Sequence, residues 1–443
     1  MSVRKKGGRR FAHLAAPLMD LAGWLAYIEQ LHPKTIALGL DRVRAVLERL
    51  AIHKSCPIFM VGGTNGKGST CAMLEAILRA SGYRVGCYSS PHLLRYNERI
   101  RVVGREADDA MLVDAFGAVE AARGDTPLTY FEFGTAAAWV VFGRASLDAL
   151  ALEIGLGGRL DAVNAFEPDC AILASVAVDH TDYLGDTRER IGWEKAHIFR
   201  PGKPAIVGDP NPPQSVLDHA RGIGADLELI GRDFGYEADR QQWRYFGRGG
   251  TRAGLAYPAL RGTAQLTNAA CAIAALDSLR ERLPIGAQDI RQGLALVELP
   301  GRFQVLPGRP AVILDVAHNA QAAAVLAANL AGMGAYRRTL AVIGMLRDKD
   351  IAAVCRELRG RIDRWYAATL DNPRGATAAE VARAIAESRA GGEVREFASP
   401  RQAIAAAQGD AADDDRIAAF GSFFTVADVM IARGATPRSP NAG

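Results

Sequence analysis

From Pro57 onward, short apolar or β-branched runs alternate along the chain with longer segments whose apolar residues recur at helical spacing. This alternation is typical of a mainly parallel sheet covered by helices on both faces, so the predicted fold class is α/β. The first of the longer segments predicts a helix at residues 69–81. The short runs predict strands at residues 58–62, 84–88, 148–153, 171–178 and 204–207.

The pattern is interrupted at Pro300-Gly301 and again at Pro307-Gly308, and a second series of strands and alanine-rich helices begins at Ala311. This series predicts strands at residues 312–315, 339–343, 365–368 and 417–420. Because 443 residues are too many for one ordinary hydrophobic core, we expect two domains. The predicted division is a mainly parallel sheet domain at residues 1–299, a linker at residues 300–310 and a smaller doubly wound, Rossmann-like domain at residues 311–443.

Composition excludes several classes of protein. Apolar residues make up 49% of the chain and the net charge is only +4, so we expect no nucleic-acid partner. The basic run Arg4-Lys5-Lys6 with Arg9-Arg10 precedes any apolar periodicity, which favours a solvated terminus over an RNA-binding arm. No apolar run approaches the ~20 residues that a membrane span requires, so we expect no contact with a membrane.

The remaining bulk features concern location and redox state. The N-terminus lacks the apolar core and cleavage site of a secretory signal, so a cytoplasmic location is expected. The six cysteines are scattered and form no Cys-x-x-Cys pair, which favours reduced, buried thiols over disulfides or zinc ligands. No additional interface element is visible, and we expect a monomer.

A glycine-rich segment, Gly63-Thr64-Asn65-Gly66-Lys67-Gly68-Ser69, lies between the first predicted strand and the first predicted helix. In such an arrangement backbone N–H groups face an anion, the lysine supplies a mobile cation, and Ser69 or Thr70 can bind Mg²⁺. The spacing departs from the standard phosphate-binding loop, because Val61 stands where the first glycine would be. A plain glycine-rich turn is the alternative, but the order of strand, lysine, hydroxyl and helix favours nucleotide binding.

Polar residues also lie at or beyond the ends of three predicted strands: Ser90, Glu153 and His180. Ligands of open α/β sheets collect beyond the carboxyl ends of the strands. A buried carboxylate requires a cation, and a carboxylate, an imidazole and a hydroxyl would together hold a second Mg²⁺ near the γ-phosphate. Taken alone, His180 would be a hydrogen-bonded structural histidine. The segment from Gly155 to Ala162 is interpreted as a mobile loop over the site, or simply as a flexible connection.

Together these segments resemble the folylpolyglutamate synthase family of the Mur ligase superfamily, in particular its bacterial members that also have dihydrofolate synthase activity. The resemblance covers nearly the whole chain. Besides the phosphate loop it includes the runs Ser89 to Leu93, Thr129 to Glu132, Leu152 to Asp161, Val178 to Asp182, Glu194-Lys195, Pro300 to Gln304, Asp315 to Asn319 and Gly421-Ser422.

The resemblance implies an ATP-dependent ligase that adds L-glutamate to dihydropteroate and to tetrahydrofolate through an acyl phosphate, with ADP and phosphate released. ATP would be the co-substrate, two Mg²⁺ ions the cofactors, and L-glutamate, dihydropteroate and reduced folates the other small-molecule partners. The second domain would close over ATP bound to the first.

The family also implies roles for individual residues. The implied Mg²⁺ ligands are Ser69, Ser90, Glu153 and His180. The implied ATP-binding residues are Thr64, Asn65, Gly66, Lys67, Gly68, Ser69, Asn268, Arg302 and Asp315. The implied pterin-binding residues are Thr129, Tyr130, Phe131, Glu132, Leu160, Asp161 and Ala162. Lys67, Lys195 and His318 are the implied catalytic residues, and Lys195 is the lysine that the superfamily carbamylates with CO₂ to N6-carboxylysine.

Several of these positions have alternative interpretations. Lys195 would otherwise be an exposed lysine two turns into a helix that starts near Thr187. His318 would orient or deprotonate the incoming amine, or form a hydrogen bond at the domain interface. His197 stands where the family usually has glycine, and Ala264-Gln265 alters the pattern that precedes Asn268.

Three other functions are compatible with parts of the pattern. A monofunctional folylpolyglutamate synthase or a cell-wall Mur-type ligase would share the fold and the phosphate loop. A P-loop switch that hydrolyses ATP slowly represents a different class, but it leaves Glu153, His180 and Lys195 unexplained. The pterin-matching segments at residues 129–132 and 160–162 favour the folate ligase.

Overall fold

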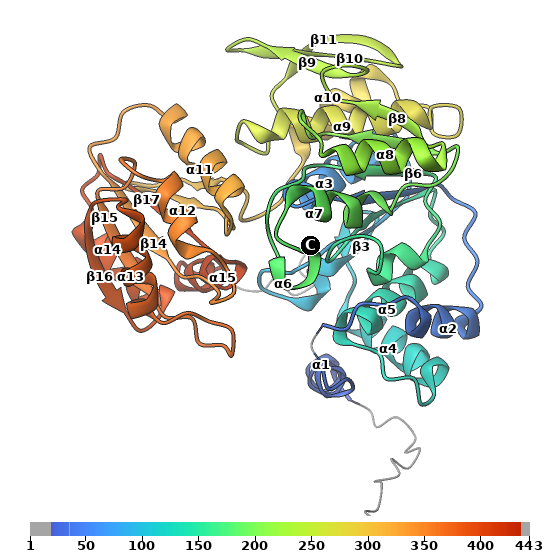
Figure 1. Cartoon of the computed structure of the whole chain (residues 1–443), viewed down its shortest axis with the longest axis horizontal. Helices are drawn as coiled ribbons and strands as arrows, with labels where there is room; N and C mark the ends of the chain where they lie inside the picture. The colour runs from blue at the N-terminus through green and yellow to red at the C-terminus, as the bar shows by residue number, and fades with distance from the viewer. Residues whose placement is uncertain (1–18, 35, 436–443) are drawn as a thin grey trace, which may run out of the picture.

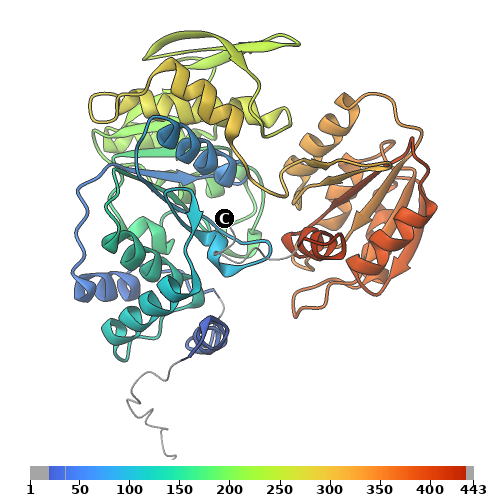
Figure 2. The same cartoon turned by 180° about the vertical axis from the view of Figure 1, so that it is seen from behind.

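The computed structural model describes residues 19–34 and 36–435, so the basic run near the N-terminus lies outside the described residues. Two sheets covered by helices lie side by side and are joined by the chain around residue 300 (Figures 1 and 2). In residues 19–34 and 36–435 no helix combines the length and the apolar character that a membrane crossing requires.

The first sheet has eight strands in the order β4-β3-β2-β5-β1-β6-β7-β8. The strands are β1 (Ile58–Gly62), β2 (Val85–Tyr88), β3 (Ile100–Val102), β4 (Arg105–Glu106), β5 (Ala149–Glu153), β6 (Cys170–Leu173), β7 (Pro204–Val207) and β8 (Asp226–Leu229). Only the pairings of β3 with β2 and β4 are antiparallel. In β1, Ile58 and Met60 enter one hydrophobic cluster while Phe59 and Val61 enter another, because successive side chains alternate between the faces.

Helices cover both faces of this sheet. One face carries α1 (Leu21–Gln30), α2 (Asp41–Leu50), α4 (Asp109–Arg123), α5 (Tyr130–Arg144), α7 (Arg188–Ala196) and α8 (Gln214–Ile223). The other carries α3 (Lys67–Ala80), α9 (Ala264–Ser278) and α10 (Ala287–Leu296). The short helices η1 (Tyr96–Arg99), η2 (Ala162–Ala165) and α6 (Thr181–Leu184) lie in connections.

A small antiparallel sheet, which the sequence pattern did not predict, covers α9 and is formed by β9 (Gly235–Ala238), β10 (Gln242–Gly247) and β11 (Gly250–Ala256) (Figure 1). Trp243 and Tyr245 point into the cluster around α9, whereas Arg244 between them is exposed. The strands therefore bury one face only.

The second sheet has the order β12-β13-β17-β14-β15-β16, and all pairings except that of β12 with β13 are parallel. Its strands are β12 (Gln304–Leu306), β13 (Ala311–Leu314), β14 (Thr339–Ile343), β15 (Arg364–Ala368), β16 (Glu393–Phe397) and β17 (Arg416–Phe420). One face carries α11 (Ala320–Gly332), α12 (Ile351–Glu357) and α13 (Ala378–Ser388), and the other carries α14 (Pro400–Asp410) and α15 (Phe423–Ala432). The predicted α/β class with a smaller doubly wound sheet is confirmed.

The structure corrects two predicted elements. The strand predicted at residues 171–178 ends at Leu173, because the next residues leave the sheet and bond to the phosphate loop: Thr64 N donates to Ser175 O at 2.8 Å. The first helix begins at Lys67 rather than at residue 69, with Gly66 as its N-cap. In the second sheet, β16 was not predicted, and residues 304–306, assigned to the linker, form β12.

The packing of α4 can be tested at Phe116, which is fully buried with its ring centroid 5.6 to 6.1 Å from those of Trp24, Tyr96 and Phe133. Phe116→Ala should destabilise this layer by about 3–5 kcal/mol, since it removes a buried ring and leaves a cavity. Met111, on the same helix, is 37% exposed, so Met111→Ala serves as the control and should cost below about 0.5 kcal/mol. Urea unfolding measures both, and equal effects would contradict the packing described.

Candidate active site

The phosphate loop joins β1 to the N-terminus of α3 and has a conformation that requires glycine. Gly66 has φ +87°, and a Cβ at this position would lie 2.5 Å from Oδ1 of Asn268. Two hydrogen bonds join the loop to the segment after β6: Asn65 N donates to Ser175 Oγ at 3.0 Å, and Ala177 N donates to Thr64 Oγ1 at 3.0 Å. The loop and the first turn of α3 line a cavity, and the N–H groups at the start of a helix have no partner within the helix, so they are available to an anion there.

Two lysines meet at one carbonyl oxygen of this loop. Lys67 Nζ donates to Gly63 O at 3.1 Å and Lys195 Nζ donates to the same atom at 3.0 Å. Lys195 is buried on α7, whose N-cap is Thr187, so it is not the exposed helix lysine of the alternative interpretation. Burial, together with the charge of Lys67, lowers the pKa of Lys195 to about 7. A large fraction of Lys195 is consequently a neutral amine at neutral pH.

Glu153 lies at the carboxyl end of β5, beside the phosphate loop. Its side chain is buried, its Oε2 accepts a hydrogen bond from Ser90 N at 3.1 Å, and burial raises the pKa of the carboxyl. Oε2 of Glu153 and Nη2 of Arg302 lie 3.6 and 3.7 Å from the position that a Cβ of Gly68 would occupy. Charges from both halves of the chain thus converge above the start of α3.

His180 is the N-cap of α6 and has a left-handed backbone, φ +53°. Burial lowers its pKa to about 4, so the imidazole is neutral and can act as a ligand at neutral pH. The pKa of its neighbour Asp179 is lowered as well: burial alone would raise it, but the interaction with His318 and the charge of Lys349 hold the pKa of this carboxyl well below its usual range.

The part of the chain that the structure describes has no group of three His, Cys, Asp or Glu side chains able to bind a metal ion. The residues still fit Mg²⁺, because this ion usually keeps several waters and needs only one or two carboxylates besides substrate phosphates. The raised pKa of the buried Glu153 carboxyl reflects a charge that a nearby cation would stabilise.

Arg302 and Asp315 reach the cavity from the second sheet and the segment that precedes it. The guanidinium of Arg302 lies 4.9 Å from the centroid of the Phe423 ring, and burial lowers its pKa. Asp315 Oδ2 accepts from Phe303 N at 3.0 Å and Oδ1 accepts from Ala317 N at 2.8 Å. Since Phe303 has φ +44°, Asp315 also stabilises the turn that positions Arg302.

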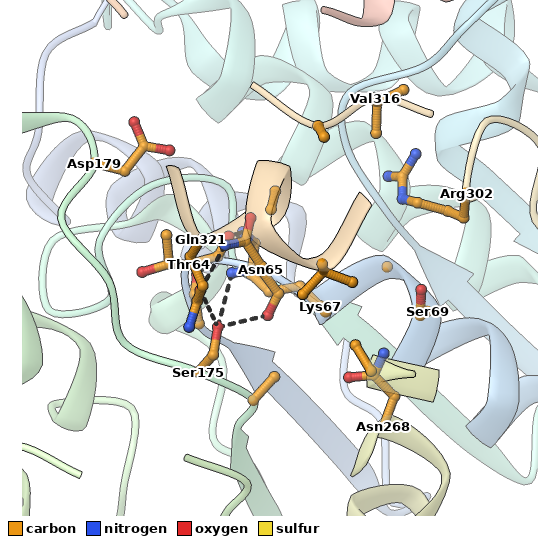
Figure 3. A pocket seen from close by; sticks show the side chains of 18 of the residues that line it. Thr64, Asn65, Lys67, Ser69, Ser175, Asp179, Asn268, Arg302, Val316 and Gln321 are labelled. Atoms are coloured by element: carbon orange, nitrogen blue, oxygen red, sulfur yellow. Dashed lines mark hydrogen bonds between the residues drawn. The ribbon is translucent and has the colours of Figure 1, made fainter. Parts of the chain in front are cut away.

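Hydrogen bonds between polar side chains, called the polar seam below, join the first domain to α11 of the second domain beside the phosphate loop. Asn65 Nδ2 donates to Gln321 Oε1 at 2.6 Å and to Asn319 Oδ1 at 3.1 Å, and the side chains of Asn65, Ser175 and Gln321 cluster in Figure 3. Farther along α11, Asn329 Oδ1 accepts from Thr263 N at 2.9 Å. These bonds hold α11 over the loop and the start of α9.

A cavity of about 370 Å³ lies between these elements (Figure 3). It is lined by the predicted residues Thr64, Asn65, Gly66, Lys67, Gly68, Ser69, Ser90, Glu153, His180, Lys195, Asn268, Arg302, Asp315 and His318. Residues that sequence reasoning did not assign to the site also line it: Ser175, Asp179, Arg261, Gln265, Gln321, Val325 and Asn329. Of these, Asp179 carried a usable signal, its place beyond the strand predicted at residues 171–178, whereas Ser175 lay inside that predicted strand and leaves the sheet because β6 ends at Leu173.

The predicted pterin-binding residues do not line this cavity and lie in the layer behind it. Thr129 and Glu132 are buried and form a capping box at the start of α5, and Asp161 caps η2 while its Oδ2 accepts from Leu156 N at 2.8 Å. The Phe131 ring packs so closely on Gly155 that a Cβ there would lie 2.4 Å from it. The two segments therefore meet behind Gly155 and Leu156, which do line the cavity.

The chain from residue 37 to residue 42 links the two pterin-matching segments. Arg42 forms an ion pair with Glu132 at 2.9 Å, and Gly39 N donates to Leu160 O at 3.2 Å. The loop after Glu153 is anchored rather than free, since Arg159 N donates to Glu194 O at 2.9 Å and the two side chains form an ion pair at 3.0 Å. The expected mobility of the segment at residues 155–162 is accordingly limited by α7.

Comparisons with known proteins agree with this geometry. Residues 61–276 match the Mur ligase middle domain, and residues 301–423 match the Mur ligase, glutamate ligase domain. The chain is 47% identical over 423 residues to the dihydrofolate synthase/folylpolyglutamate synthase of Escherichia coli, covering 95% of this chain and 97% of the relative.

Solved structures are similar over nearly the whole chain. A structure of E. coli FolC in complex with DHPP and ADP has a TM-score of 0.89 at 47% identity and covers 94% of this chain and 98% of its own. A bifunctional folylpolyglutamate synthase/dihydrofolate synthase with Mn, AMPPNP and L-glutamate bound has a TM-score of 0.87 at 46% identity, covering 94% and 99%.

The two-sheet fold, the phosphate loop and the charges at the strand ends define an enzyme of the Mur ligase class. Identity at this level over almost the full length of both chains places it more narrowly: the chain belongs to the dihydrofolate synthase/folylpolyglutamate synthase family, and it is a ligase. Relatives in this family bind a nucleotide and a divalent metal ion.

The steric role of Gly66 can be tested by nucleotide binding. Gly66→Ala should weaken ADP binding at least about tenfold, because the added Cβ collides with Asn268 and displaces the loop. Gly82 is the matched control: it follows the same helix with φ +89°, but nothing lies within 4 Å of its Cβ position. Calorimetric titration with ADP distinguishes a collision at the loop from general backbone strain, and equal losses in both variants would exclude the collision.

Proposed function

We propose that the chain joins L-glutamate to dihydropteroate and to tetrahydrofolate at the cavity between the two sheets, through an acyl phosphate. The observation that carries the proposal is the convergence of the phosphate loop, Glu153, His180 and Arg302 on one cavity, with the pterin-matching segments directly behind its wall. The relatives support it, since one solved structure contains DHPP and ADP and another contains AMPPNP and L-glutamate.

The chemistry requires an activated acid. A carboxylate does not acylate an amine at neutral pH because oxide is a poor leaving group. Attack of the substrate carboxylate on the γ-phosphorus of ATP releases ADP and gives an acyl phosphate. The amine of glutamate then adds to the acyl carbon, and the tetrahedral intermediate expels phosphate as the amide forms. The protein positions the reactants and neutralises charge with Lys67 and Arg302.

Two Mg²⁺ ions fit the donors present. Ser69 would bind the ion shared with the phosphates of ATP, while Ser90, Glu153 and His180 would hold the second. When bound, the ions supply charge neutralisation for the transferred phosphoryl group. The Glu153 carboxylate is oriented even without bound ions, because it accepts a hydrogen bond from Ser90 N.

The remaining contacts with ATP come from both halves of the chain. The N–H groups from residue 64 to residue 69 would bind the phosphates, Asn268 lies against Gly66, and Arg302 and Asp315 complete the cavity from the second sheet. Closure of the two domains, at residues 1–299 and 311–443, therefore accompanies ATP binding. The seam between Asn65, Asn319 and Gln321 supports this proposal.

The folate would lie with its pterin toward the segments at residues 129–132 and 160–162. The half-buried rings of Tyr130 and Phe131 provide apolar faces, whereas Thr129, Glu132 and Asp161 already satisfy backbone N–H groups and would act mainly by shaping the site. The acid group would extend past Gly155 toward Glu153.

Lys195 is proposed to carry a carbamate. CO₂ reacts with a neutral amine. Lys67 and Lys195 both contact Gly63 O, so two ammonium groups would repel one another there, and loss of the proton from Lys195 relieves that repulsion. The product is a carboxylate-like group beside Lys67, which also suits metal binding. His197, which replaces the usual glycine, lies at the C-cap of α7 and leaves Lys195 in the site.

His318 has both ring nitrogens near acceptors. Nδ1 donates to Val316 O at 2.8 Å, and Nε2 lies 3.6 Å from Asp179 Oδ2. This arrangement favours a role in orienting the amine and joining the domains over removal of a proton from the amine.

The proposed reaction is tested by product formation. Phosphate release with ATP and Mg²⁺ should require glutamate together with either dihydropteroate or tetrahydrofolate, and mass spectrometry should show one added glutamyl group in each case. Glu153→Gln keeps an acceptor for Ser90 N but removes the charge, so turnover should fall by about 10²–10³ while ADP binding without metal persists. Release that is independent of the folate would refute the ligase mechanism, and activity with tetrahydrofolate alone would indicate a monofunctional enzyme.

The modification of Lys195 has a distinct pH signature. Because its pKa is about 7, the ammonium form that cannot attack CO₂ prevails below pH 7, and the carbamate should increase as the pH rises through 7. Carbon-13 NMR with labelled bicarbonate at a fixed concentration of dissolved CO₂ detects it, and Lys195→Arg is the control without signal. Lys195→Ala should lose about 10²-fold in turnover and be partly rescued by short carboxylic acids. Unimpaired Lys195→Ala would exclude a role for the carbamate.

A further inference from the structure

Asp179 lies in the connection between β6 and α6, and three side chains of the second domain surround its carboxylate. Its Oδ1 accepts from Lys349 Nζ at 2.5 Å and its Oδ2 accepts from Asn319 Nδ2 at 3.1 Å. His318 Nε2 lies 3.6 Å from Oδ2, and the N–H of the next residue, His180, donates to Oδ1 at 2.8 Å.

The ion pair between Asp179 and Lys349 is a largely buried link between the two domains. The side chains of Asp179 and Lys349 are 8% and 7% exposed. Lys349 lies in the turn between β14 and α12, at the carboxyl end of a central strand of the second sheet. The pair therefore joins the binding edges of the two sheets directly.

Burial makes this link strongly dependent on both partners. Removing one member of a buried pair leaves an uncompensated charge in a medium of low dielectric constant, whereas removing both leaves none. The pair can form only when the second domain is seated on the first, because the two residues belong to different sheets. When the domains separate, both groups return to water.

We propose that Asp179 and Lys349 are positioning residues for the ligation: their ion pair fixes the second domain at the edge of the first sheet and places His318 and Arg302 over the phosphate loop. The inference deepens the proposed function and rests on it. Asp179 is suited to this task because its backbone is joined to His180, so the same short segment aligns a proposed metal ligand and the second domain.

The geometry also explains the orientation of His318. Nδ1 of the ring donates to Val316 O at 2.8 Å, and the Asp179 carboxylate lies 3.6 Å from Nε2, so the ring has an acceptor at each nitrogen. Without the Asp179 carboxylate, only the Val316 bond would remain to orient it. Asn319, the N-cap of α11, would similarly lose one of its links to the first domain.

The test uses Asp179→Asn, Lys349→Met and the double variant in the full-length protein with ATP, Mg²⁺, glutamate and tetrahydrofolate. Each single variant should melt several degrees lower than the wild type, and the double variant should recover most of that loss because no unpaired charge remains. Turnover should stay about 10–100-fold low in all three, since misplacement of the second domain persists. Scattering with AMPPNP should show a less compact protein in all three.

Arg347→Met is the matched control. Arg347 belongs to the same turn and pairs with Glu380 at 3.1 Å, but this pair is exposed and lies within the second domain. Its loss should change turnover less than about twofold.

Recovery of turnover to within about threefold of wild type in the double variant would overturn the proposal, because the pair would then serve stability alone. Normal turnover in Lys349→Met would overturn it as well. If a single variant fails to fold, the double variant still decides the question. Failure of the proposed function has a different signature, since the wild type itself would then form no glutamyl product.

Discussion

The site depends on one physical constraint: charges buried at the edge of a sheet must find partners there. Parallel strands end at the same edge, so Glu153 and the phosphate loop are neighbours despite some ninety residues of intervening chain. Several buried charges at this edge lie near opposite charges from another segment, as Glu153 does near Arg302 and Asp179 near Lys349. Arg302 comes from the segment that precedes the second sheet, and Lys349 comes from the turn after β14. The site is therefore assembled from residues of both domains, and the buried charges of either domain would lack these partners if the other were absent.

The same constraint accounts for the state of Lys195. Its amine would be an ordinary ammonium in water, but here it lies in the interior beside Lys67, and both point at the carbonyl of Gly63. Burial and the like charge act in the same direction on the pKa of Lys195. The carbamylation proposed for Lys195 would thus follow from the position of its amine.

Much of this arrangement could be predicted from the sequence, because buried parallel strands are continuous apolar runs and the polar residues that follow them must lie at one edge. This is why Ser90, Glu153 and His180 were found as a group. Short strands with polar faces, such as β16 with Glu393 and Arg395, carry no comparable signal.

Other features depend on distances that no local pattern contains. The pairing of Asp179 with Lys349 joins residues 170 positions apart and requires the relative placement of two sheets. Likewise, the capping role of Thr129 and Glu132 is visible as a helix-start pattern, but their place behind the cavity wall arises from the packing of Phe131 on Gly155. Long-range packing, not local preference, decides these contacts.

The outer strands of the second sheet have a consequence for how copies of the chain meet. One edge strand is β12, which is three residues long and antiparallel to its neighbour. The other edge strand is β16, in which Glu393, Arg395 and Glu396 are exposed. A short border offers few free hydrogen-bonding groups, and a charged one repels an identical strand. Addition of a strand from a second molecule is therefore disfavoured at both edges of this sheet.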